Sequence, residues 1–432
     1  MPTRPENHRT IRMVTALHGL AFLACASGEL EATPQDTVSR AAVRAMAAWN
    51  TIALRTTLTT TINPPRETRA LAMMSIAVFD AVNAITGRYE TFALRVVADR
   101  SASPEAAVSA ASHHVLAALY PSAAASLEAS YDSALAGIPA GPAKGAGIAA
   151  GEAAAKAVLA MRERDPASDR SSYRVGSGVG VWVPTPPAFS AALESGWGKV
   201  APFVLDSGSQ YRPAAPPRPG STTYVRDYAE VVTLGSARSA TRTAAQTETA
   251  HFWMATAPQL WNQLVRQLTV AREMDAASAA RAYLLLNVAG ADAAIASWDA
   301  KFAYGQWRPV TAIRSLADDG SVSTQSDTAW LPLLATPPFP DYPAGHTTYG
   351  GAAEHVLNAV FGDKPGGLSL TSPTATGVTH HYESFHEIAE EVVNARVWAG
   401  VHWRTSCTAG RELGRQVGAR VLTRAPRQRV TP

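Results

Sequence analysis

Apolar residues recur at spacings of three and four along most of this 432-residue chain. The stretches TVSRAAVRAMAAWNTIALRTTL (37–58) and RETRALAMMSIAVFDAVNAI (66–85) show this pattern clearly. Such spacing places the apolar side chains on one face of an α-helix. Runs in which apolar and polar residues alternate over the length needed for a large sheet are missing from the sequence. The chain is therefore predicted to be all-α.

Prolines and glycines mark where the predicted helices begin and end. Pro64 and Pro65 precede the second apolar stretch, and proline fits the first turn of a helix. Further helices are predicted at 104–119, 122–137, 145–163, 222–233, 242–254, 257–270, 275–317 with a break, 346–361, 383–398 and 409–423. Residues 164–221 are rich in Pro, Gly and Ser and indicate long irregular loops. We expect one bundle-like domain with an N-terminal helical part at 36–163 and a C-terminal helical part at 222–425.

Composition argues against several classes of protein. The net charge of +3 is small and scattered, so nucleic acid is not an expected partner. The two cysteines, Cys25 and Cys407, exclude a disulfide scaffold. Beyond position 26, every apolar run is interrupted by a charge before it is long enough to span a bilayer, so no stable membrane insertion is expected.

The segment 1–26 is typical of an export signal. Three arginines precede the apolar stretch MVTALHGLAFLACASG (13–28), which contains small residues around Cys25. The stretch is too short to remain in a membrane as a spanning helix. The sequence therefore predicts an exported protein, periplasmic or extracellular. The alternatives are a lipoprotein anchored through Cys25 and a partly apolar N-terminus without a targeting role.

The first chemistry-bearing segment is WDAKFAYGQWRPVTAIR (298–314). Lys301 and Arg308 are seven residues apart, close to two helical turns, so both are predicted to project from one helix face. Trp298 shares that face. On this helix alone, the alternative is two surface cations whose stems cover apolar neighbours.

The second segment is PPFPDYPAGHTTYGG (337–351). Its prolines favour extended backbone up to Pro343, and Gly345 allows a tight turn. Backbone amides around His346 would then form the open N-terminus of a helix, which is a ready site for an anion. A loop histidine that caps the helix is the alternative.

The third segment is NARVWAGVHWRTS (394–406). Arg396 and His402 are six residues apart, and Gly400 predicts that the helix ends between them, so both side chains can point at one place. The alternative is an arginine in a surface ion pair and a histidine in the core. The three segments together supply three cations and two histidines, without a matching group of carboxylates. This set fits an oxyanion of charge near −2, with the histidines as ligand or nucleophile and as proton donor.

The motifs K-x6-RP, P-A-G-H and R-x5-H resemble those of the vanadium-dependent haloperoxidases, most closely the soluble bacterial branch, and of their relatives, the type-2 phosphatidic acid phosphatases. The resemblance extends to RALAMMSIAVFDAVNAI, WVPTPPAF, ARSATRTAAQTETAHFW and ELGRQVG, and so covers nearly the whole chain that follows the predicted export signal. It implies an all-helical bundle of the haloperoxidase and acid phosphatase type, with vanadate as cofactor.

The resemblance also implies a role for each motif residue. His402 would bond axially to vanadium, and His346 would be the acid–base partner at the opposite apex. Three cations would neutralise the equatorial oxygens: Lys301, Arg308 and Arg396. The amide of Gly345 would be a further donor, and Lys301 would also polarise peroxide.

The implied reaction is oxidation of a halide by hydrogen peroxide to a hypohalous acid equivalent, with a small organic acceptor as an optional partner. Trp298 and Phe339 match aromatic positions that flank the halide site in chloride-oxidising members of the family. Core packing is the alternative for both residues.

Three positions depart from the family pattern. Ala344 replaces a serine, and losing a hydroxyl bond to a charged group costs about 1.5–3 kcal/mol, so vanadate should bind ten- to a hundredfold more weakly unless water substitutes. Ala395 replaces another serine. Ser406 stands where an acid is usual, four residues after His402, so the partner that orients this histidine is missing or comes from elsewhere.

Other functions use some of the same residues. A soluble acid phosphatase would use His402 as the nucleophile, although the missing acid counts against it. A non-catalytic oxyanion binder would need the cations alone. A di-iron protein would use two Glu-x-x-His pairs, Glu248 with His251 and Glu383 with His386.

Overall fold

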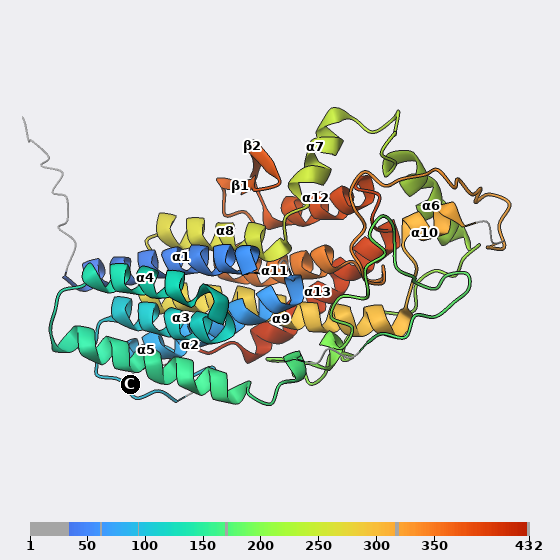
Figure 1. Ribbon diagram of the computed structural model, residues 1–432. Helices are drawn as coiled ribbons and strands as arrows, with labels where there is room; N and C mark the ends of the chain where they lie inside the picture. Colours follow the sequence, from blue (N-terminus) through green and yellow to red (C-terminus); the bar gives the residue numbers. More distant parts are fainter. Residues whose placement is uncertain (1–33, 61–62, 94, 169–171, 316–318, 430–432) are drawn as a thin grey trace, which may run out of the picture.

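The computed structural model describes residues 34–60, 63–93, 95–168, 172–315 and 319–429, without the side chains of 34–37. The predicted export signal, including Cys25, lies outside these ranges and stays a prediction. Within the described ranges the regular secondary structure is helical apart from one two-stranded sheet, which confirms the all-α prediction (Figure 1).

Five helices make up the N-terminal part: α1 (Pro34–Thr60), α2 (Pro64–Thr86), α3 (Pro104–Leu119), α4 (Ala124–Ala136) and α5 (Pro142–Met161). At the start of α2 the side chain of Asn63 accepts a hydrogen bond from the amide of Arg66, and Pro64 and Pro65 occupy the first turn, as predicted. Short 3₁₀ turns lie between α3 and α4 at Pro121–Ala123, and after α5 at Pro166–Ser168 and Trp197–Lys199. The most apolar window of α2 is long enough to cross a membrane, but 89% of it is buried within the protein.

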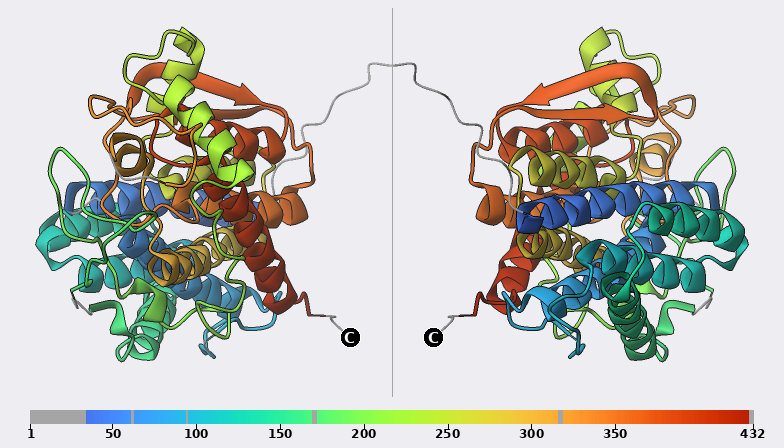
Figure 2. Two further views of the ribbon diagram at one scale, coloured as in Figure 1. Left: turned by 90° about the vertical axis from the view of Figure 1, so that its right-hand side faces the viewer. Right: turned by 90° about the vertical axis from the view of Figure 1, so that its left-hand side faces the viewer.

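The C-terminal part contains α6 (Thr222–Leu234), α7 (Ala244–Phe252), α8 (Ala257–Ala271), α9 (Ala276–Tyr304), α10 (Pro309–Arg314), α11 (Gly345–Phe361), α12 (Phe385–Trp398) and α13 (Arg404–Arg424). Helix α9 lies at the centre and packs against α1, α2, α8, α11 and α13, so it joins the two parts (Figures 1 and 2). Most residues of α9 are buried. The division into an N-terminal part and a C-terminal part describes only the order of the helices along the chain.

The predicted break in 275–317 falls at Gly305, which adopts a left-handed conformation with φ 58° and ends α9. Arg308 has extended backbone and stands just before α10. The prediction that Lys301 and Arg308 share one helix face is therefore wrong, because the chain turns between them. Helix α13 also begins five residues before the predicted start at 409, directly after His402 and Trp403.

The two strands, β1 (Leu368–Ser372) and β2 (Ala375–Tyr382), form an antiparallel hairpin that the sequence did not predict. The hairpin packs on α7, α8 and α12. Side-chain amides of α8 hold β1, because Gln267 Nε2 donates to Ser369 O at 2.7 Å and Gln263 Nε2 donates to Thr371 O at 2.8 Å.

The long loops are tied to the core by a buried carboxylate on α9. Asp292 accepts hydrogen bonds from the amides of Phe203, Val204 and Leu205 at 2.7, 2.8 and 2.9 Å. Burial raises the pKa of Asp292 to about 6, although these amides act in the opposite direction. The loop 201–205 is therefore fixed against the central helix.

Helices α11 and α13 approach each other so closely that glycine is required at the contact. A Cβ atom on Gly414 would overlap the carbonyl oxygen of Thr348, and one on Gly351 would overlap that of Arg411. The amide of Ala344 also donates to Ser406 O at 2.9 Å. These contacts fix the N-terminal half of α11 against the N-terminal half of α13.

We predict that Gly414→Ala lowers the free energy of unfolding by about 1–3 kcal/mol, because the added methyl group overpacks the contact between α11 and α13. Urea unfolding followed by circular dichroism would measure the change. Gly137→Ala is the control, because its added Cβ atom would meet only Ala134 O, at 3.6 Å. Equal stability of the Gly414 variant and the wild type would contradict the close approach.

A second prediction concerns Glu67, which is buried on α2 and accepts a hydrogen bond from Thr57 Oγ1 at 3.2 Å. Burial raises the pKa of Glu67 from 4.5 to about 7, although hydrogen bonds from Thr256, Thr57 and Gln259 oppose the shift. Native Glu67 therefore holds its proton to a higher pH than the unfolded chain does. The contribution of Glu67 therefore lowers the free energy of unfolding by up to about 3 kcal/mol as the pH rises from about 4.5 past about 7.

Glu67→Gln removes this titration, so we expect the variant to gain stability over the wild type at pH 8 but little at pH 4.5. Urea unfolding at the two pH values measures the difference. The exposed Glu383→Gln variant is the control and should track the wild type. An identical gain at both pH values would show that the effect does not come from ionisation.

Candidate oxyanion site

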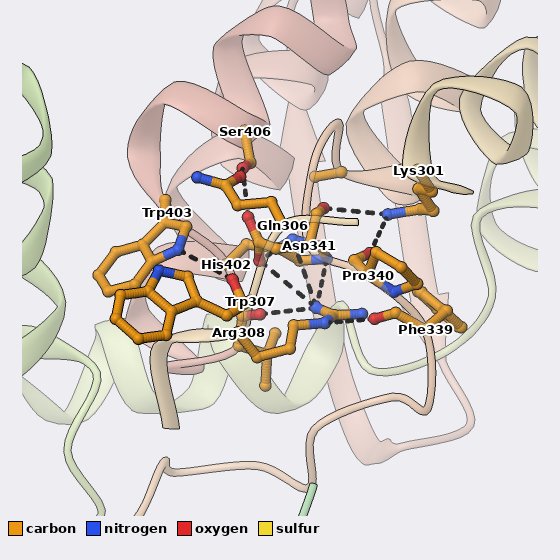
Figure 3. A network of polar contacts seen from close by, with 12 residues as sticks. Lys301, Gln306, Trp307, Arg308, Phe339, Pro340, Asp341, His402, Trp403 and Ser406 are labelled. Atoms are coloured by element: carbon orange, nitrogen blue, oxygen red, sulfur yellow. Dashed lines mark hydrogen bonds and ion pairs between the residues drawn. The ribbon is translucent and has the colours of Figure 1, made fainter. Parts of the chain in front are cut away.

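The three sequence motifs meet at one buried place between the helices. Lys301 comes from the end of α9 and Arg308 from the segment before α10. Phe339, Pro340 and Asp341, from the segment that leads into α11, lie beside both side chains (Figure 3). Arg396 and His402 come from the end of α12 and the loop before α13. All three predicted segments are thus brought together.

A cavity of about 50 Å³ lies at this place. Its walls include Trp298, Phe339, Gly345, His346, Arg396 and His402, together with residues of α2 and α8 such as Pro64 and Pro258. This volume holds about four water-sized groups, which is the size of a tetrahedral oxyanion. A larger open depression of about 910 Å³ lies beside Arg88 and Arg100 and contains none of the motif residues.

Lys301 is completely buried and its ammonium group is held by backbone carbonyls. Nζ donates to Pro340 O at 2.9 Å and to Asp341 O at 3.0 Å, which uses two of its three protons. Burial, followed by the neighbouring Arg308, lowers the pKa of Lys301 well below its usual value. An anion beside Lys301 would favour its charged form.

Arg308 and Arg396 are also buried, and each has an N–H group without a partner among the described residues. Arg308 donates through Nε to Phe339 O at 2.8 Å and through Nη1 to Val401 O at 2.7 Å, which leaves Nη2 unpaired. Arg396 donates through Nη1 to Trp253 O at 3.0 Å, which leaves Nε unpaired. Burial lowers the pKa of both guanidinium groups to about 10. Unpaired buried donors of this kind are costly and point to a ligand.

The N-terminus of α11 opens beside these cations, as predicted. Ala344 is the N-cap residue, with extended backbone, and no side chain caps the first amides. A Cβ atom on Gly345 would lie 3.3 Å from the indole ring of Trp298, so glycine lets the backbone approach this wall. The substitution of serine by Ala344 leaves these amides available to an anion.

His346 contacts a backbone carbonyl that fixes its neutral form. Nε2 lies 3.0 Å from Ala255 O, and because a carbonyl only accepts, Nε2 carries the proton. The other ring nitrogen, Nδ1, is then free to accept. Burial, followed by the charge of Arg396, lowers the pKa of His346 to about 3, so the ring is neutral in the protein without an anion.

His402 follows the end of α12, where Gly400 has φ 75° and turns the chain, which confirms the predicted helix end. Its ring is buried, with Nε2 3.1 Å from Arg308 Nη1. Arginine only donates, so this contact favours a lone pair on Nε2 and a proton on Nδ1. Burial and the nearby cations, Arg308 first, lower the pKa of His402 well below its usual value.

Asp341 is the important residue that the sequence analysis missed. Its Oδ1 lies 2.9 Å from His402 Nδ1 and 3.7 Å from Arg308 Nη1, and its Oδ2 accepts a short hydrogen bond from Ser406 (Figure 3). Burial raises the pKa of Asp341 to about 6, while the Arg308 charge acts against this shift. Asp341 is the only acid in the segment 337–351, and this was the available sequence signal.

The other predicted positions are divided between the site and the core. Trp298 and Phe339 line the cavity with ring centroids 4.9 Å apart, and Lys301 Nζ lies 5.8 and 5.0 Å from the two centroids. Ala395 is buried in the hydrophobic core.

The two Glu-x-x-His pairs do not form a di-iron site. His380 lies between Glu391, at 2.9 Å, and Glu248, at 3.7 Å, whereas Glu383 precedes α12 instead of lying on it. Among the described residues, no group of three or more His, Cys, Asp or Glu side chains could hold a metal ion. The di-iron hypothesis is therefore wrong for this part of the chain.

The residues at the cavity fit vanadate. The unpaired N–H groups of Arg308 and Arg396 and the uncapped amides of α11 would donate to its oxygens, and the lone pair on Nε2 of His402 would be available to the metal. The cavity also has the size of a tetrahedral oxyanion.

Comparison with known proteins gives a consistent result. Residues 281–430 match the model of the VCPO second helical-bundle domain. Vanadium chloroperoxidase of Curvularia inaequalis is 28% identical over 247 residues, which cover 42% of this chain and 40% of that protein. The match thus spans less than half the length of this curated relative.

Two solved structures share the fold over most of the chain. The first bacterial vanadium-dependent iodoperoxidase has a TM-score of 0.76 and 25% sequence identity, covering 88% of this chain and 96% of its own. A holo-type bacterial vanadium-dependent chloroperoxidase has a TM-score of 0.66 over 85% of this chain and 93% of its own, and at 16% identity it supports the fold alone. In its second helical bundle, its fold and its motifs, the chain is thus similar to vanadium-dependent haloperoxidases.

Proposed function

We propose that this protein is a vanadate-dependent haloperoxidase that oxidises a halide with hydrogen peroxide to a hypohalous acid equivalent. The observation that carries the proposal is a charge imbalance. Lys301, Arg308 and Arg396 are all at most 4% exposed, and Asp341 is the one carboxylate within ion-pair distance of any of them among the described residues. Buried cations without matching anions are unfavourable, so an oxyanion ligand is needed to complete the site.

The residues around the cavity would hold vanadate from two sides. His402 would bind the metal through Nε2, while the three cations and the Gly345 amide would bind its oxygens. Vanadate, when bound, supplies a Lewis-acid centre that activates hydrogen peroxide toward the halide. The fixed cations would withdraw charge from the oxygens without reorganising.

His346 would handle the proton of the peroxide. Because Ala255 O holds the Nε2 proton of His346, its Nδ1 is the nitrogen that would accept a proton from hydrogen peroxide and return it to the peroxide oxygen that leaves as water. The cations lower the pKa of His346 in the protein without an anion, and a bound dianion would offset that effect.

The halide would approach along the wall formed by Trp298 and Phe339. The indole N–H of Trp298 donates to Leu193 O at 3.2 Å, so the ring, and not its polar group, faces the cavity region. The cavity of about 50 Å³ is filled by the oxyanion and leaves little space for an organic acceptor. The oxidised halogen would therefore react with an acceptor outside the site.

A soluble acid phosphatase is the second candidate, and the contact between Asp341 and His402 favours it. A nucleophilic histidine benefits from a carboxylate on its far nitrogen, and Asp341 lies 2.9 Å from Nδ1. The absent acid at position 406 therefore does not count against a phosphatase. The same cations would bind a phosphoryl group, whose transferring geometry vanadate resembles.

The first experiment is halogenation of a dione dye with peroxide and chloride, bromide or iodide, with and without added orthovanadate. We expect turnover that requires vanadate and falls to background in His402→Ala, because the metal loses its protein ligand. Turnover that is equal without vanadate, or none at saturating vanadate, would contradict the proposal.

The same preparation then separates the remaining candidates. Hydrolysis of a phosphoester that vanadate inhibits would identify a phosphatase. Tight vanadate binding without turnover of either substrate would identify a non-catalytic oxyanion binder.

A further prediction is that Arg396→Met raises the dissociation constant of vanadate ten- to a hundredfold, because one charge-assisted donor is lost. Isothermal titration calorimetry with orthovanadate measures this constant. Arg266→Met is the control, because Arg266 is also largely buried but bonds Asn50 on α1, away from the cavity. Equal affinities for the Arg396 variant and the wild type would show that vanadate binds elsewhere.

A further inference from the structure

The carboxyl group of Asp341 faces His402 from a different part of the chain than the family pattern implies. The resemblance places an acid four residues after this histidine, but that position is Ser406. In the structure the carboxylate is that of Asp341, in the loop before α11. The hydroxyl group of Ser406 donates a hydrogen bond to it. A carboxylate therefore does lie beside His402, but the loop before α11 supplies it instead of α13.

Asp341 is held firmly on its other sides. Its amide donates to Gln306 O at 2.9 Å, and its carbonyl oxygen accepts from Lys301 Nζ at 3.0 Å. With the Ser406 hydroxyl on Oδ2, only Oδ1 remains for the histidine. A buried side chain with its backbone and one oxygen fixed loses little freedom when it makes one more contact.

The contact to His402 is at hydrogen-bonding distance but is not aligned. Nδ1 and Oδ1 are 2.9 Å apart, yet Oδ1 does not receive a linear hydrogen bond. Arg308 Nη1 lies against the same ring, 3.1 Å from Nε2 and 3.4 Å from Nδ1. Catalytic hydrogen bonds are often poorly aligned before a ligand binds and become linear once it is in place.

We propose that Asp341 is the positioning residue for His402, with Ser406 as the donor that fixes the carboxylate. An oxyanion in the cavity draws Arg308 to its own oxygens, so the ring turns and its Nδ1–H meets Oδ1 of Asp341. The carboxylate then keeps the proton on Nδ1 and directs the Nε2 lone pair at the ligand. This inference rests on the oxyanion site of the proposed function, although it does not require a particular reaction.

A merely structural role is the competing explanation. Asp341 is 3.7 Å from Arg308 Nη1 and could serve only to neutralise this buried cation. Loss of the carboxylate would then destabilise the fold, but the histidine tautomer and the affinity of the folded protein for vanadate would stay unchanged. The two roles therefore differ in measurements that do not depend on catalysis.

The test measures orthovanadate binding by calorimetry and the ring nitrogens of His402 by NMR of the ¹⁵N-histidine-labelled full chain at pH 8. For Asp341→Ala we expect a ten- to a hundredfold weaker vanadate affinity, the usual effect of removing a group that orients a metal ligand. We also expect the proton of His402 to shift from Nδ1 toward Nε2. Asp341→Asn keeps the shape of the side chain and serves if the alanine variant does not fold.

A double variant gives the sharpest outcome. Asp341→Ala combined with Ser406→Asp returns the carboxylate to α13, four residues after His402. We expect the double variant to bind vanadate at least tenfold more tightly than Asp341→Ala does. We also expect the proton of His402 to be back on Nδ1. Asp292→Asn is the control, because Asp292 is another buried carboxylate but bonds the loop 203–205, and it should leave both readouts unchanged.

Unchanged vanadate affinity and an unchanged tautomer in folded Asp341→Ala or Asp341→Asn would overturn the proposal, as would failure of the double variant to restore either readout. If the wild type binds vanadate without haloperoxidase turnover, the proposed function fails while the role of Asp341 is still decided by affinity. If the wild type does not bind vanadate, the same two measurements with inorganic phosphate, which offers the same oxyanion chemistry, decide it.

Discussion

Three positive charges are buried in one small volume, and backbone carbonyl groups hold them there. Carbonyls of residues 339–341 accept from Lys301 and Arg308, while those of Val401 and Trp253 accept from Arg308 and Arg396. Without these carbonyls, desolvation would drive the cations out of the interior or out of their charged form. The proline-rich loop before α11 is needed for this purpose, because an extended segment can turn successive carbonyls toward buried donors while a helix cannot.

The same constraint explains why the helices around the site pack so closely. A cation held by a carbonyl has a fixed position only if the segment bearing the carbonyl is fixed. The glycines between α11 and α13 provide this by allowing backbone contact between the two helices. The hydrogen bond from Ala344 N to Ser406 O then joins the two first turns. These contacts hold the segments that carry His346 and His402 next to each other.

Features with local causes could be predicted from the sequence. The helix predicted at 104–119 is found at Pro104–Leu119, because a serine cap and a proline begin it and the apolar spacing continues to its end. The predicted end of α12 before Gly400 follows equally from local geometry. The prediction that Lys301 and Arg308 share one helix face was wrong, because Gly305 ends α9 between them. The spacing of two residues in the sequence defines a shared face only within one continuous helix. That the three motifs serve one oxyanion site was inferred from their combined cations and histidines and from the family resemblance, and not from periodicity.

Asp341 could not be assigned from the sequence, because its contact with His402 depends on the tertiary packing of two segments that lie far apart along the chain. The one local signal is that Asp341 is the only acid in the segment 337–351, and this does not say which residue it contacts. Similarly, the β1–β2 hairpin is held by glutamine side chains of α8, so its cause lies outside its own sequence.

The choice between a haloperoxidase and a phosphatase depends on access to the site more than on its residues. The cations, the amide of Gly345 and the paired His402 suit both reactions, since both place five oxygen or nitrogen ligands around one central atom. A phosphoester must also place its organic leaving group beside the phosphoryl group. The cavity is limited to about 50 Å³, with Trp298, Phe339 and two prolines of α2 among its walls. These walls would leave little space for such a leaving group beside a bound oxyanion, which favours the proposed haloperoxidase over a phosphatase.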